Sequence, residues 1–299
     1  MTSPARIGMD IGGTKTEAIA LDELGRVEAT VTRPTVSGAE GVLSTAEAAV
    51  AELAERTGRT GFASIGVGLP GQIDRRSGEV RNAYNMGIDS LAIGPELGRR
   101  TGIPVSIDND VTAAAIGAAH LMELGGTVAY LNLGTGVASG IIVDGAPLRG
   151  KLGMAGEIGH LPIGRLGRPC PCGQTGCLET EASGSALKAY WPAGGEHPGR
   201  TLLTAAASGD RDARRCFELL VQGAASAIRL LGLSLDPDSL VIGGGLRLLG
   251  APLRDGIRDE LARWEAESPF LAALELSRRF QLLPEGSPAA AVGAALAAG

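Results

Sequence analysis

"MDIGGTKTEAIALDELG", residues 9–25, aligns without gaps with "LNLGTGVASGIIVDGAP", residues 131–147, when the chain is shifted against itself by 122 positions. The shift places Asp10 on Asn132, Gly12 on Gly134 and Asp22 on Asp144. Each copy reads as a strand, a glycine-threonine loop, a second strand and an acidic turn. The repeat predicts two related lobes that face each other across a ligand-binding cleft. A chance match is the alternative, because glycine-rich loops between strands recur widely.

Strands alternate with helices along the rest of the chain. Residues 5–10 read as a strand, and residues 40–56 carry alanine, leucine and glutamate at helical spacing. "ASIGVGLPGQID" reads as a buried strand that runs into a glycine-proline loop. The strand "PVSID" is followed by the helical segment "NDVTAAAIGAAHLMEL". This alternation predicts an α/β sheet protein.

The charge balance argues against nucleic acid as a partner. The 299 residues include 27 basic and 33 acidic side chains, a net charge of -6, and no basic run overrides that total. The opening "MTSPARIGMD" lacks the apolar stretch of a signal peptide. No run of about 18 apolar residues is long enough to span a bilayer. We expect a cytoplasmic protein with neither a nucleic-acid nor a membrane partner.

Three of the four cysteines fall within "CPCGQTGC", residues 170–177. Clustered cysteines in a reducing cytoplasm ligate metal more often than they form disulfides. A tetrahedral structural zinc needs four ligands, and the fourth cysteine, Cys216, lies far along the chain in an apparent helix. His160, in "GEIGH", is a nearer donor. We predict a zinc site of His160, Cys170, Cys172 and Cys177, with unpaired thiols or a redox pair as the alternative.

Three glycine loops are candidates for binding a nucleotide. "DIGGTK" is not a Walker loop, because Thr14 precedes Lys15 and the next segment reads as strand; "GTGVASG" does not have the spacing of a dinucleotide fingerprint. Both loops nevertheless offer backbone N–H groups and a threonine hydroxyl to a phosphate. "VIGGGL" would let a base or ribose approach the backbone closely. Each loop alone can be a plain turn, whereas the three together favour a nucleotide. The candidate residues are Asp10, Gly12, Gly13, Thr14, Lys15, Gly134, Thr135, Gly136, Gly243, Gly244 and Gly245.

Acidic residues mark two candidate sites of chemistry. In "IDND", residues 107–110, any of Asp108, Asn109 and Asp110 can cap the following helix, but one cap needs only one of them. An aspartate near phosphate loops can also deprotonate a hydroxyl during phosphoryl transfer. Capping and catalysis both remain open here. Glu157 and Glu179 flank the cysteine segment, where a zinc would hold them rigidly for sugar hydroxyls; solvated surface acids are the alternative.

These segments together resemble the ROK family of sugar kinases and sugar-responsive repressors, within the actin-like ATPase superfamily. The resemblance runs from Met9 to about residue 298 and includes "DIGGTKT", "GVGLPGQID", "NDVTAAA" and "LGTG". "GEIGH" with "CPCGQTGCLE" fits the family signature C-x-C-G-x-x-G-C-x-E at every fixed position. The resemblance implies a two-lobed α/β fold, ribonuclease H-like, with a duplicated sheet core and an interlobe cleft. We expect a smaller lobe over 1–112, a larger lobe with the zinc site over 113–288, and a final helix, 289–299, returning to the smaller lobe.

The resemblance also implies roles for individual residues. Asp110 is similar to the family's catalytic base, and the sugar-contacting set corresponds to Asn85, Asn109, Asp110, Glu157, His160 and Glu179, with Gly71 beside the ring. The zinc shapes the sugar pocket without performing the chemistry. Family members that use polyphosphate generally lack this cysteine cluster, which favours Mg-ATP as the donor. Two departures stand out: Thr112 replaces a usual asparagine, and Ala138-Ser139 replace glycines, which could alter nucleotide affinity.

The resemblance implies an ATP-dependent hexose kinase of the glucokinase type, acting on the C6 hydroxyl. An N-acetylhexosamine kinase is the alternative within the same class. A sugar-responsive regulator is the alternative from another class; it is disfavoured because the first strand begins within about six residues of Met1, which leaves no helix-turn-helix segment ahead of it. The expected partners are a sugar, ATP and a second copy of the chain in a homodimer.

Overall fold

The chain folds into two compact units. The computed structural model describes residues 5–164, 166–195 and 198–298, apart from the side chain of residue 200. The first unit comprises the chain up to Leu124, the segment Gly145–Gly153 and the residues from Gly286 onward, and the second comprises Gly125–Asp144 and Met154–Glu285. The first unit therefore extends beyond the expected boundary at residue 112, because a helix that starts at Asp110 packs within it.

The strands and helices follow one another in the alternating order expected of an α/β protein. The strands are β1 (Arg6–Ile11), β2 (Lys15–Leu21), β3 (Val27–Pro34), β4 (Ile65–Leu69), β5 (Gln72–Asp74), β6 (Glu79–Ala83), β7 (Ile88–Leu91), β8 (Val105–Asn109), β9 (Thr127–Leu133), β10 (Val137–Val143), β11 (Ala146–Pro147), β12 (Ser239–Gly243) and β13 (Phe280–Leu282). The α-helices are α1 (Ala39–Thr57), α2 (Ile93–Thr101), α3 (Asp110–Leu121), α4 (Glu179–Ala182), α5 (Gly184–Tyr190), α6 (Pro198–Ala207), α7 (Arg211–Leu235), α8 (Ala251–Glu267), α9 (Pro269–Ala272) and α10 (Ala289–Ala297).

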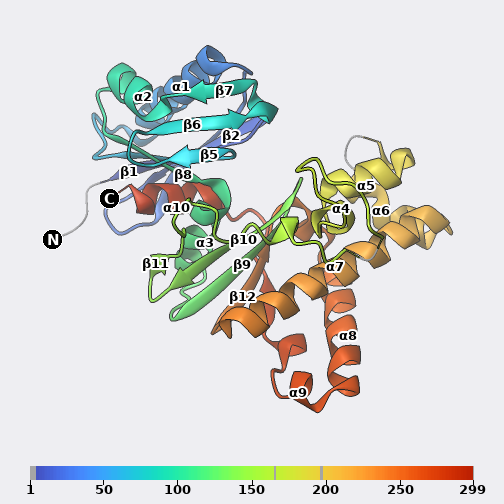
Figure 1. The fold of residues 1–299 in the computed structure, drawn as a ribbon. Coiled ribbons are helices and arrows are strands. Elements are labelled where there is room, and N and C mark those ends of the chain that lie inside the picture. Colours follow the sequence, from blue (N-terminus) through green and yellow to red (C-terminus); the bar gives the residue numbers. More distant parts are fainter. Residues whose placement is uncertain (1–4, 165, 196–197, 299) are drawn as a thin grey trace. The chain divides into compact units, whose positions relative to one another are not determined.

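Two five-stranded sheets confirm the duplication predicted from the sequence (Figure 1). Their strand orders, β3-β2-β1-β4-β8 and β11-β10-β9-β12-β13, correspond position by position. In each sheet the central strand runs antiparallel to the strand that follows it and parallel to the next one across. Asp10 lies opposite Gly68 in the first sheet, as Asn132 lies opposite Gly243 in the second. The two units therefore repeat one framework, and the repeated glycine loops occupy equivalent places in it.

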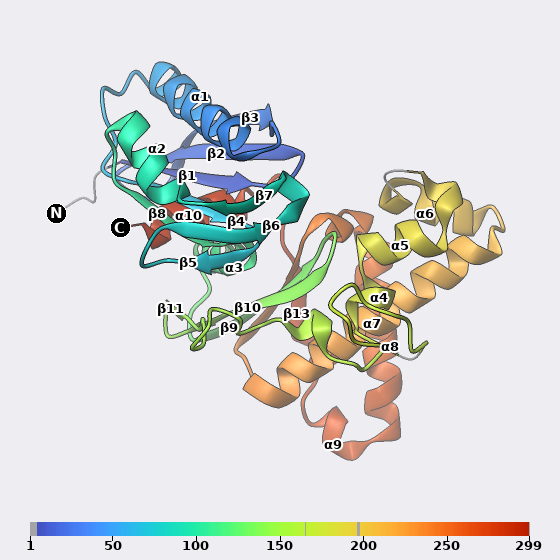
Figure 2. The same ribbon diagram turned by 45° about the horizontal axis from the view of Figure 1, so that its top comes forward.

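The first sheet is covered by helices on both faces (Figure 2). Successive side chains of a strand point to opposite faces, and β2 shows this clearly. Ala18 and Ala20 join the core beneath α1 and α2, whereas Ile19 and Leu21 pack against α10 on the other face. The contact between α10 and α3 is close, since a Cβ added to Gly117 would lie 1.8 Å from the Ala289 carbonyl oxygen. The last helix thus belongs to the same unit as the first strand.

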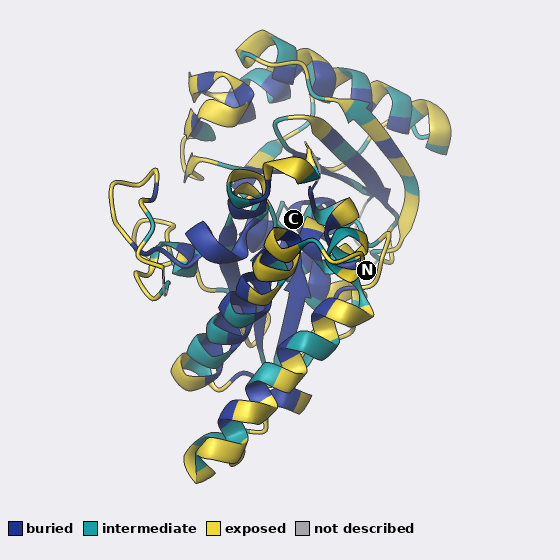
Figure 3. Ribbon diagram, turned by 90° about the vertical axis from the view of Figure 1, so that its right-hand side faces the viewer, coloured by how far each residue is buried: buried dark blue, intermediate teal, exposed yellow. Residues whose placement is uncertain are grey.

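The second unit is built around α7, the longest helix of the chain. The Asp210 carboxylate caps it by accepting from the Asp212 and Ala213 backbone N–H groups at 3.0 and 2.9 Å. By length and composition α7 alone among the described residues could cross a membrane, but 61% of its most apolar window is buried within the protein. Figure 3 shows that helices carry buried and exposed residues in alternation, while central strands are largely buried. The apolar face of α7 is therefore accounted for by the core.

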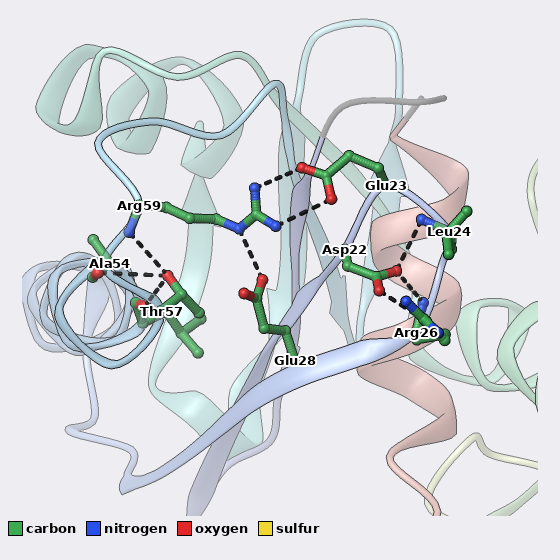
Figure 4. A network of polar contacts seen from close by, with 9 residues as sticks. Asp22, Glu23, Leu24, Arg26, Glu28, Ala54, Thr57 and Arg59 are labelled. Carbon is green, nitrogen blue, oxygen red and sulfur yellow. Dashed lines mark hydrogen bonds and ion pairs between the residues drawn. The ribbon is translucent and has the colours of Figure 1, made fainter. Parts of the chain in front are cut away.

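A surface network closes the acidic turn of the first unit (Figure 4). Asp22 accepts from the Arg26 backbone N–H at 2.8 Å and from the Arg26 side chain at 2.9 Å. Arg59, just after α1, donates to Glu23 at 2.7 Å and to Glu28 at 2.8 Å. Water screens exposed ion pairs of this kind, so each contributes little to the free energy of unfolding. The network fixes the position of the turn without adding much to the free energy of unfolding.

Candidate functional site

The first glycine loop is a tight turn between β1 and β2. The Gly12 N–H donates to the Lys15 carbonyl oxygen at 2.9 Å, so that amide is engaged within the turn. Thr14 and Lys15 are exposed, and the Lys15 ammonium lies 3.2 Å from Glu17. A Cβ added to Gly13 would meet the Asn85 carbonyl oxygen at 2.6 Å. The loop therefore packs directly against Asn85, although the two are far apart in the sequence.

The strand ends beside this loop carry the acidic candidates. Parallel strands β1, β4 and β8 end at the same edge of the first sheet, which brings Asp10 close to the β8–α3 junction. Asp10 is partly buried. Its burial first, and then the negative charges of Asp110 and Glu17, raise its pKa to about 7, against an opposing effect of Lys15. A carboxyl group that titrates near neutral pH is a feature of functional sites more often than of surfaces.

The structure assigns a different task to each polar residue of "IDND". Asn109 is the helix cap, because its Oδ1 accepts from the Val111 and Thr112 backbone N–H groups at 3.0 and 3.1 Å. Asp110 begins α3 and accepts from Val111 N–H at 2.9 Å; its burial raises its pKa above the usual range. Asp108 is only 4% exposed and is bound by Arg149. Since Asn109 does the capping, Asp110 is left for another role.

Gly71 and Asn85 complete the candidates in the first unit. Gly71 has a φ of +113°, and a Cβ added to it would lie 2.8 Å from the Arg81 carbonyl oxygen of β6. Asn85 lies in the 3-10 turn Tyr84–Met86, which follows β6 directly, and its side chain is exposed. Asp10, the first glycine loop, Asn85, Asn109 and Asp110 thus all belong to the first unit.

The second glycine loop repeats the first between β9 and β10. The Gly134 N–H donates to the Gly136 carbonyl oxygen at 3.0 Å, and Thr135 is exposed. The start of α5 reaches the same loop, since Gly184 N–H donates to the Gly134 carbonyl oxygen at 2.8 Å and Ser185 N–H to the Thr135 carbonyl oxygen at 3.1 Å. Backbone N–H groups at the start of α5 therefore fix the carbonyl groups of this loop, while the Thr135 side chain remains exposed.

The third glycine stretch lies directly beside the second loop. Gly243 ends β12, which runs parallel to β9, so the glycines emerge at the same sheet edge as the second loop. Gly244 has a φ of +76°, and a Cβ added to it would lie 2.3 Å from the Leu133 carbonyl oxygen. Outside its own turn, no atom of the described residues lies within 4 Å of where a Gly245 Cβ would stand. The two loops proposed from sequence to hold one nucleotide are thus neighbours in the second unit.

The predicted cysteine-histidine cluster is assembled. The ligand atoms of His160, Cys170, Cys172 and Cys177 all lie within 4.8 Å of one another. Cys170 Sγ is 3.8 Å from His160 Nδ1, and the sulfurs of Cys172 and Cys177 are 3.6 Å apart. Zn–S bonds of about 2.3 Å and Zn–N bonds of about 2.0–2.1 Å in a tetrahedron separate ligand atoms by about 3.5–3.8 Å. The geometry is compatible with a tetrahedral metal ion.

Gln174 supports this cluster and was not singled out from the sequence. Its side-chain Nε2 donates to the His160 carbonyl oxygen at 3.1 Å and to Cys172 Sγ at 3.5 Å. Hydrogen bonds from the Gln174 backbone and then from its side chain lower the pKa of Cys172 to about 6. The only sequence signal was its place at a variable position of the cysteine signature. Such donors stabilise the thiolate form that a metal requires.

Glu179 lies between the cluster and the second glycine loop. Its Oε1 is 3.3 Å from Cys170 Sγ and 3.5 Å from His160 Nδ1, and its Oε2 would be 3.0 Å from a Cβ added to Gly136. Glu157 is exposed and precedes the 3-10 turn Ile158–His160. The second unit therefore brings the Glu179 carboxylate to the histidine of the cluster, whereas Glu157 is linked to it through the backbone, since the His160 N–H donates to the Glu157 carbonyl oxygen at 3.2 Å.

Ser139, which with Ala138 replaces glycines of the family pattern, is hydrogen-bonded to the segment before Glu157. Its hydroxyl donates to the Gly156 carbonyl oxygen at 3.1 Å, and its backbone N–H donates to the same oxygen at 2.7 Å. The side chain is buried and fixes the segment that leads into Glu157. Ser139 therefore fixes the Gly156 backbone, which directly precedes Glu157.

Two units with sheets of one strand order define a two-lobed protein of the actin-like ATPase type. Solved structures share this fold: a ROK hexokinase from Thermus thermophilus has a TM-score of 0.81 at 30% identity, over 98% of this chain and 97% of that one. A ROK family glucokinase from Streptomyces griseus, in complex with glucose and AMPPNP, has a TM-score of 0.80 at 32% identity, over 98% and 99%.

The sequence comparison agrees with the fold. A glucokinase of Halalkalibacterium halodurans is 30% identical over 312 aligned positions, covering 96% of this chain and 92% of the relative. The ROK family model matches residues 6–298. The chain therefore belongs to the ROK family, as a sugar kinase of the actin-like ATPase type.

Proposed function

We propose that this sugar kinase transfers the γ-phosphate of ATP to the C6 hydroxyl of glucose or a similar hexose, with Asp110 as the general base. The similarity to a glucokinase and to the structure of another in complex with glucose and AMPPNP supports a hexose acceptor and a nucleotide donor. The choice of ATP, of the C6 hydroxyl and of the base is our own.

The observation that carries the proposal is that the three polar side chains of "IDND" have different hydrogen-bond partners. Asn109 caps α3 and Asp108 is neutralised by Arg149, whereas the donors to the Asp110 carboxylate are backbone N–H groups at the start of α3. Asp110 thus has an oxygen available to accept a proton. The C6 oxygen forms its bond to the γ-phosphorus, the bond from that phosphorus to the leaving ADP oxygen breaks, and the hydroxyl proton passes to Asp110. Because this transition state is loose, placing the hydroxyl matters more than raising the basicity of the carboxylate.

The sugar hydroxyls are assigned to five polar side chains. These are Asn85, Asn109, Glu157, His160 and Glu179. Asn109 Oδ1 is occupied by the helix cap, so its Nδ2 is the group left to donate to a hydroxyl. Glu179 can accept from a pair of hydroxyls. Gly71 has no side chain to obstruct the ring.

The donor is assigned to the three glycine loops. Thr14 and Lys15 of the first loop and Thr135 of the second are exposed and suited to phosphate oxygens, while Gly243, Gly244 and Gly245 leave room for the ribose or base. Mg²⁺ arrives with ATP as part of the substrate and offsets phosphate charge. No part of the proton transfer depends on it.

The cysteine cluster is assigned to a structural zinc. Its four donors are the soft sulfur and imidazole ligands that zinc prefers, and the distances between them are compatible with a tetrahedron. A bound zinc would brace the segment from His160 to Glu179. The residues of the cluster hold Glu179 in place, so that its carboxylate can accept hydrogen bonds from sugar hydroxyls.

An ADP-release assay over a panel of acceptors tests the proposal. Glucose, mannose, fructose, N-acetylglucosamine and N-acetylmannosamine are compared with ATP as donor, and with polyphosphate in a parallel series. We expect glucose or mannose with ATP to give the highest kcat/KM. A clear preference for an N-acetylhexosamine would replace the hexose, a preference for polyphosphate would replace ATP, and no turnover with any pair would remove the proposed function.

A further inference from the structure

Asp108 is a buried carboxylate at the end of β8 for which the proposed reaction has no task. It is 4% exposed and lies two positions before Asp110. Its Oδ1 accepts from the Asn109 backbone N–H at 3.0 Å. The side chain therefore contacts the residue that caps α3, at the junction where the proposed base is placed.

Arg149 binds this carboxylate at two points. Its Nε lies 3.1 Å from Asp108 Oδ2 and 3.3 Å from Oδ1, and its terminal nitrogen Nη2 lies 2.5 Å from Oδ2. The Arg75 Nε stands farther away, at 3.6 Å. A planar guanidinium that grips both oxygens fixes the rotamer of the carboxylate as well as balancing its charge. Asp108 is thereby held in the orientation that reaches Asn109.

Several charged groups surround the Asp110 carboxylate. Asp10 of β1 interacts with it electrostatically, and Glu17 and Lys15 of β2 act in turn on Asp10. Asp108 stands on β8, with Arg149 and Arg75 against it. Helix α10 has no titratable side chain within Ala289–Ala297. Arg149 is thus the cation that directly compensates the acid nearest to Asp110 in the chain.

We propose that Arg149 is a positioning residue for phosphoryl transfer, which acts by orienting and neutralising Asp108 so that Asn109 caps the helix and Asp110 stays available as the base. This proposal rests on the proposed function. Arg149 touches no reacting group in it. If the Arg149 guanidinium is removed, the buried Asp108 charge keeps only the more distant Arg75 as a partner and opposes ionisation of Asp110 more strongly.

The pH dependence of kcat/KM separates this role from a merely structural one. Replacing Arg149 by Met should raise the pKa of Asp110, so the acid limb of the profile moves to higher pH by about one unit. Asp108→Asn alone leaves Arg149 unpaired and should move the limb to lower pH. The double variant should return close to wild type. Arg149→Lys keeps the charge and should keep the wild-type limb while lowering kcat, because a single ammonium cannot fix both oxygens.

The proposal would be overturned if the acid limb of the kcat/KM profile lay at the same pH in wild type, Arg149→Met and Asp108→Asn. It would also be overturned if the double variant kept the shifted limb of Arg149→Met. If Arg149→Met does not fold, the opposite shift expected for Asp108→Asn still decides the matter. If wild type phosphorylates no sugar, the proposed function fails first. The titration of the Asp110 carboxyl carbon by ¹³C NMR then tests the same charge relation without activity, with Asp110→Asn providing the assignment.

Discussion

Asp10 of β1 and Asp110 of α3 interact electrostatically, and Gly68 of β4 lies next to both. Asp10 is opposite Gly68 in the sheet, and a Cβ added to Gly68 would stand 3.5 Å from the Asp110 Cα. The missing side chain leaves room for two acids from neighbouring elements. Burial and the charge of Asp110 together raise the pKa of Asp10 to about 7, so this pair changes its charge within the physiological range.

Replacing Asp10 by Asn should alter how stability depends on pH. The folded protein keeps the Asp10 proton up to about pH 7, whereas the unfolded chain releases it near the usual aspartate pKa of 3.8, so wild-type stability falls as the pH rises through this window. Asp10→Asn has no such loss. It should therefore match wild type near pH 4 and exceed it above pH 7 by at most about 4 kcal/mol.

Urea unfolding at pH 4 and pH 8 measures this difference in the free energy of unfolding. The exposed Asp89, changed to Asn, is the control and should leave both values unchanged. Equal stability of Asp10→Asn and wild type at pH 8 would contradict the neutral pKa. Activity of Asp10→Asn should fall even where its stability rises, because this residue is proposed to serve the nucleotide.

Asp110→Asn should remove turnover while leaving the fold in place. Asn can still accept from the Val111 N–H through its amide oxygen, but it cannot take a proton from a hydroxyl. We expect kcat to fall about 10²–10⁴-fold with little change in glucose binding. Steady-state kinetics with calorimetric glucose binding checks this, with the exposed Asp259→Asn as control. A variant that retains wild-type kcat would remove Asp110 from the base role.

The sheet framework was predictable because it is encoded locally and twice. The shift that aligns the two quoted segments also aligns β2 (Lys15–Leu21) with β10 (Val137–Val143) residue for residue. Strand alternation and the glycine loops lie within these stretches, so one copy supports the interpretation of the other. The extent of the first unit was harder to predict from the sequence, because α10 packs against α3, and these helices are more than a hundred residues apart in the chain.

Within the site, the sequence indicated which residues gather but not how they divide their tasks. Three side chains of "IDND" could cap α3, and only the structure shows that Asn109 does so. Asp108 is instead bound by Arg149, which is 41 residues away along the chain and which no local pattern connects to it. The cysteine cluster was predictable from spacing alone because its ligands lie within one short segment, with His160 just before it.

Cys172→Ser should release zinc and weaken sugar binding. Serine offers no thiolate, and the cluster would keep three of its four donors. The glucose KM should rise more than the ATP KM, because Glu179 lies 3.3 Å from Cys170 and 3.5 Å from His160.

Cys216→Ser is the matched control: this cysteine is buried in α7 and outside the cluster. Elemental analysis should find stoichiometric zinc in wild type and in the control, and little in Cys172→Ser. Zinc retained at wild-type level by Cys172→Ser would count against this ligand set.

Gly244→Ala and Gly245→Ala form a pair that tests the third glycine stretch. At Gly244 the φ of +76° strains any other residue, and the added Cβ would stand 2.3 Å from the Leu133 carbonyl oxygen. The change should cost about 1–3 kcal/mol and push the stretch away from the second loop, which raises the KM for ATP. At Gly245 the new Cβ would meet no described residue outside its own turn within 4 Å, so stability should change by about 0.5 kcal/mol or less. Urea midpoints report the first quantity and initial rates at varied ATP the second. Because Gly244 and Gly245 are both proposed to leave room for the ribose or base, a Cβ at either position should raise the KM for ATP, whereas only Gly244→Ala should lower the urea midpoint. An unchanged KM for ATP in both variants would contradict a nucleotide site at this stretch.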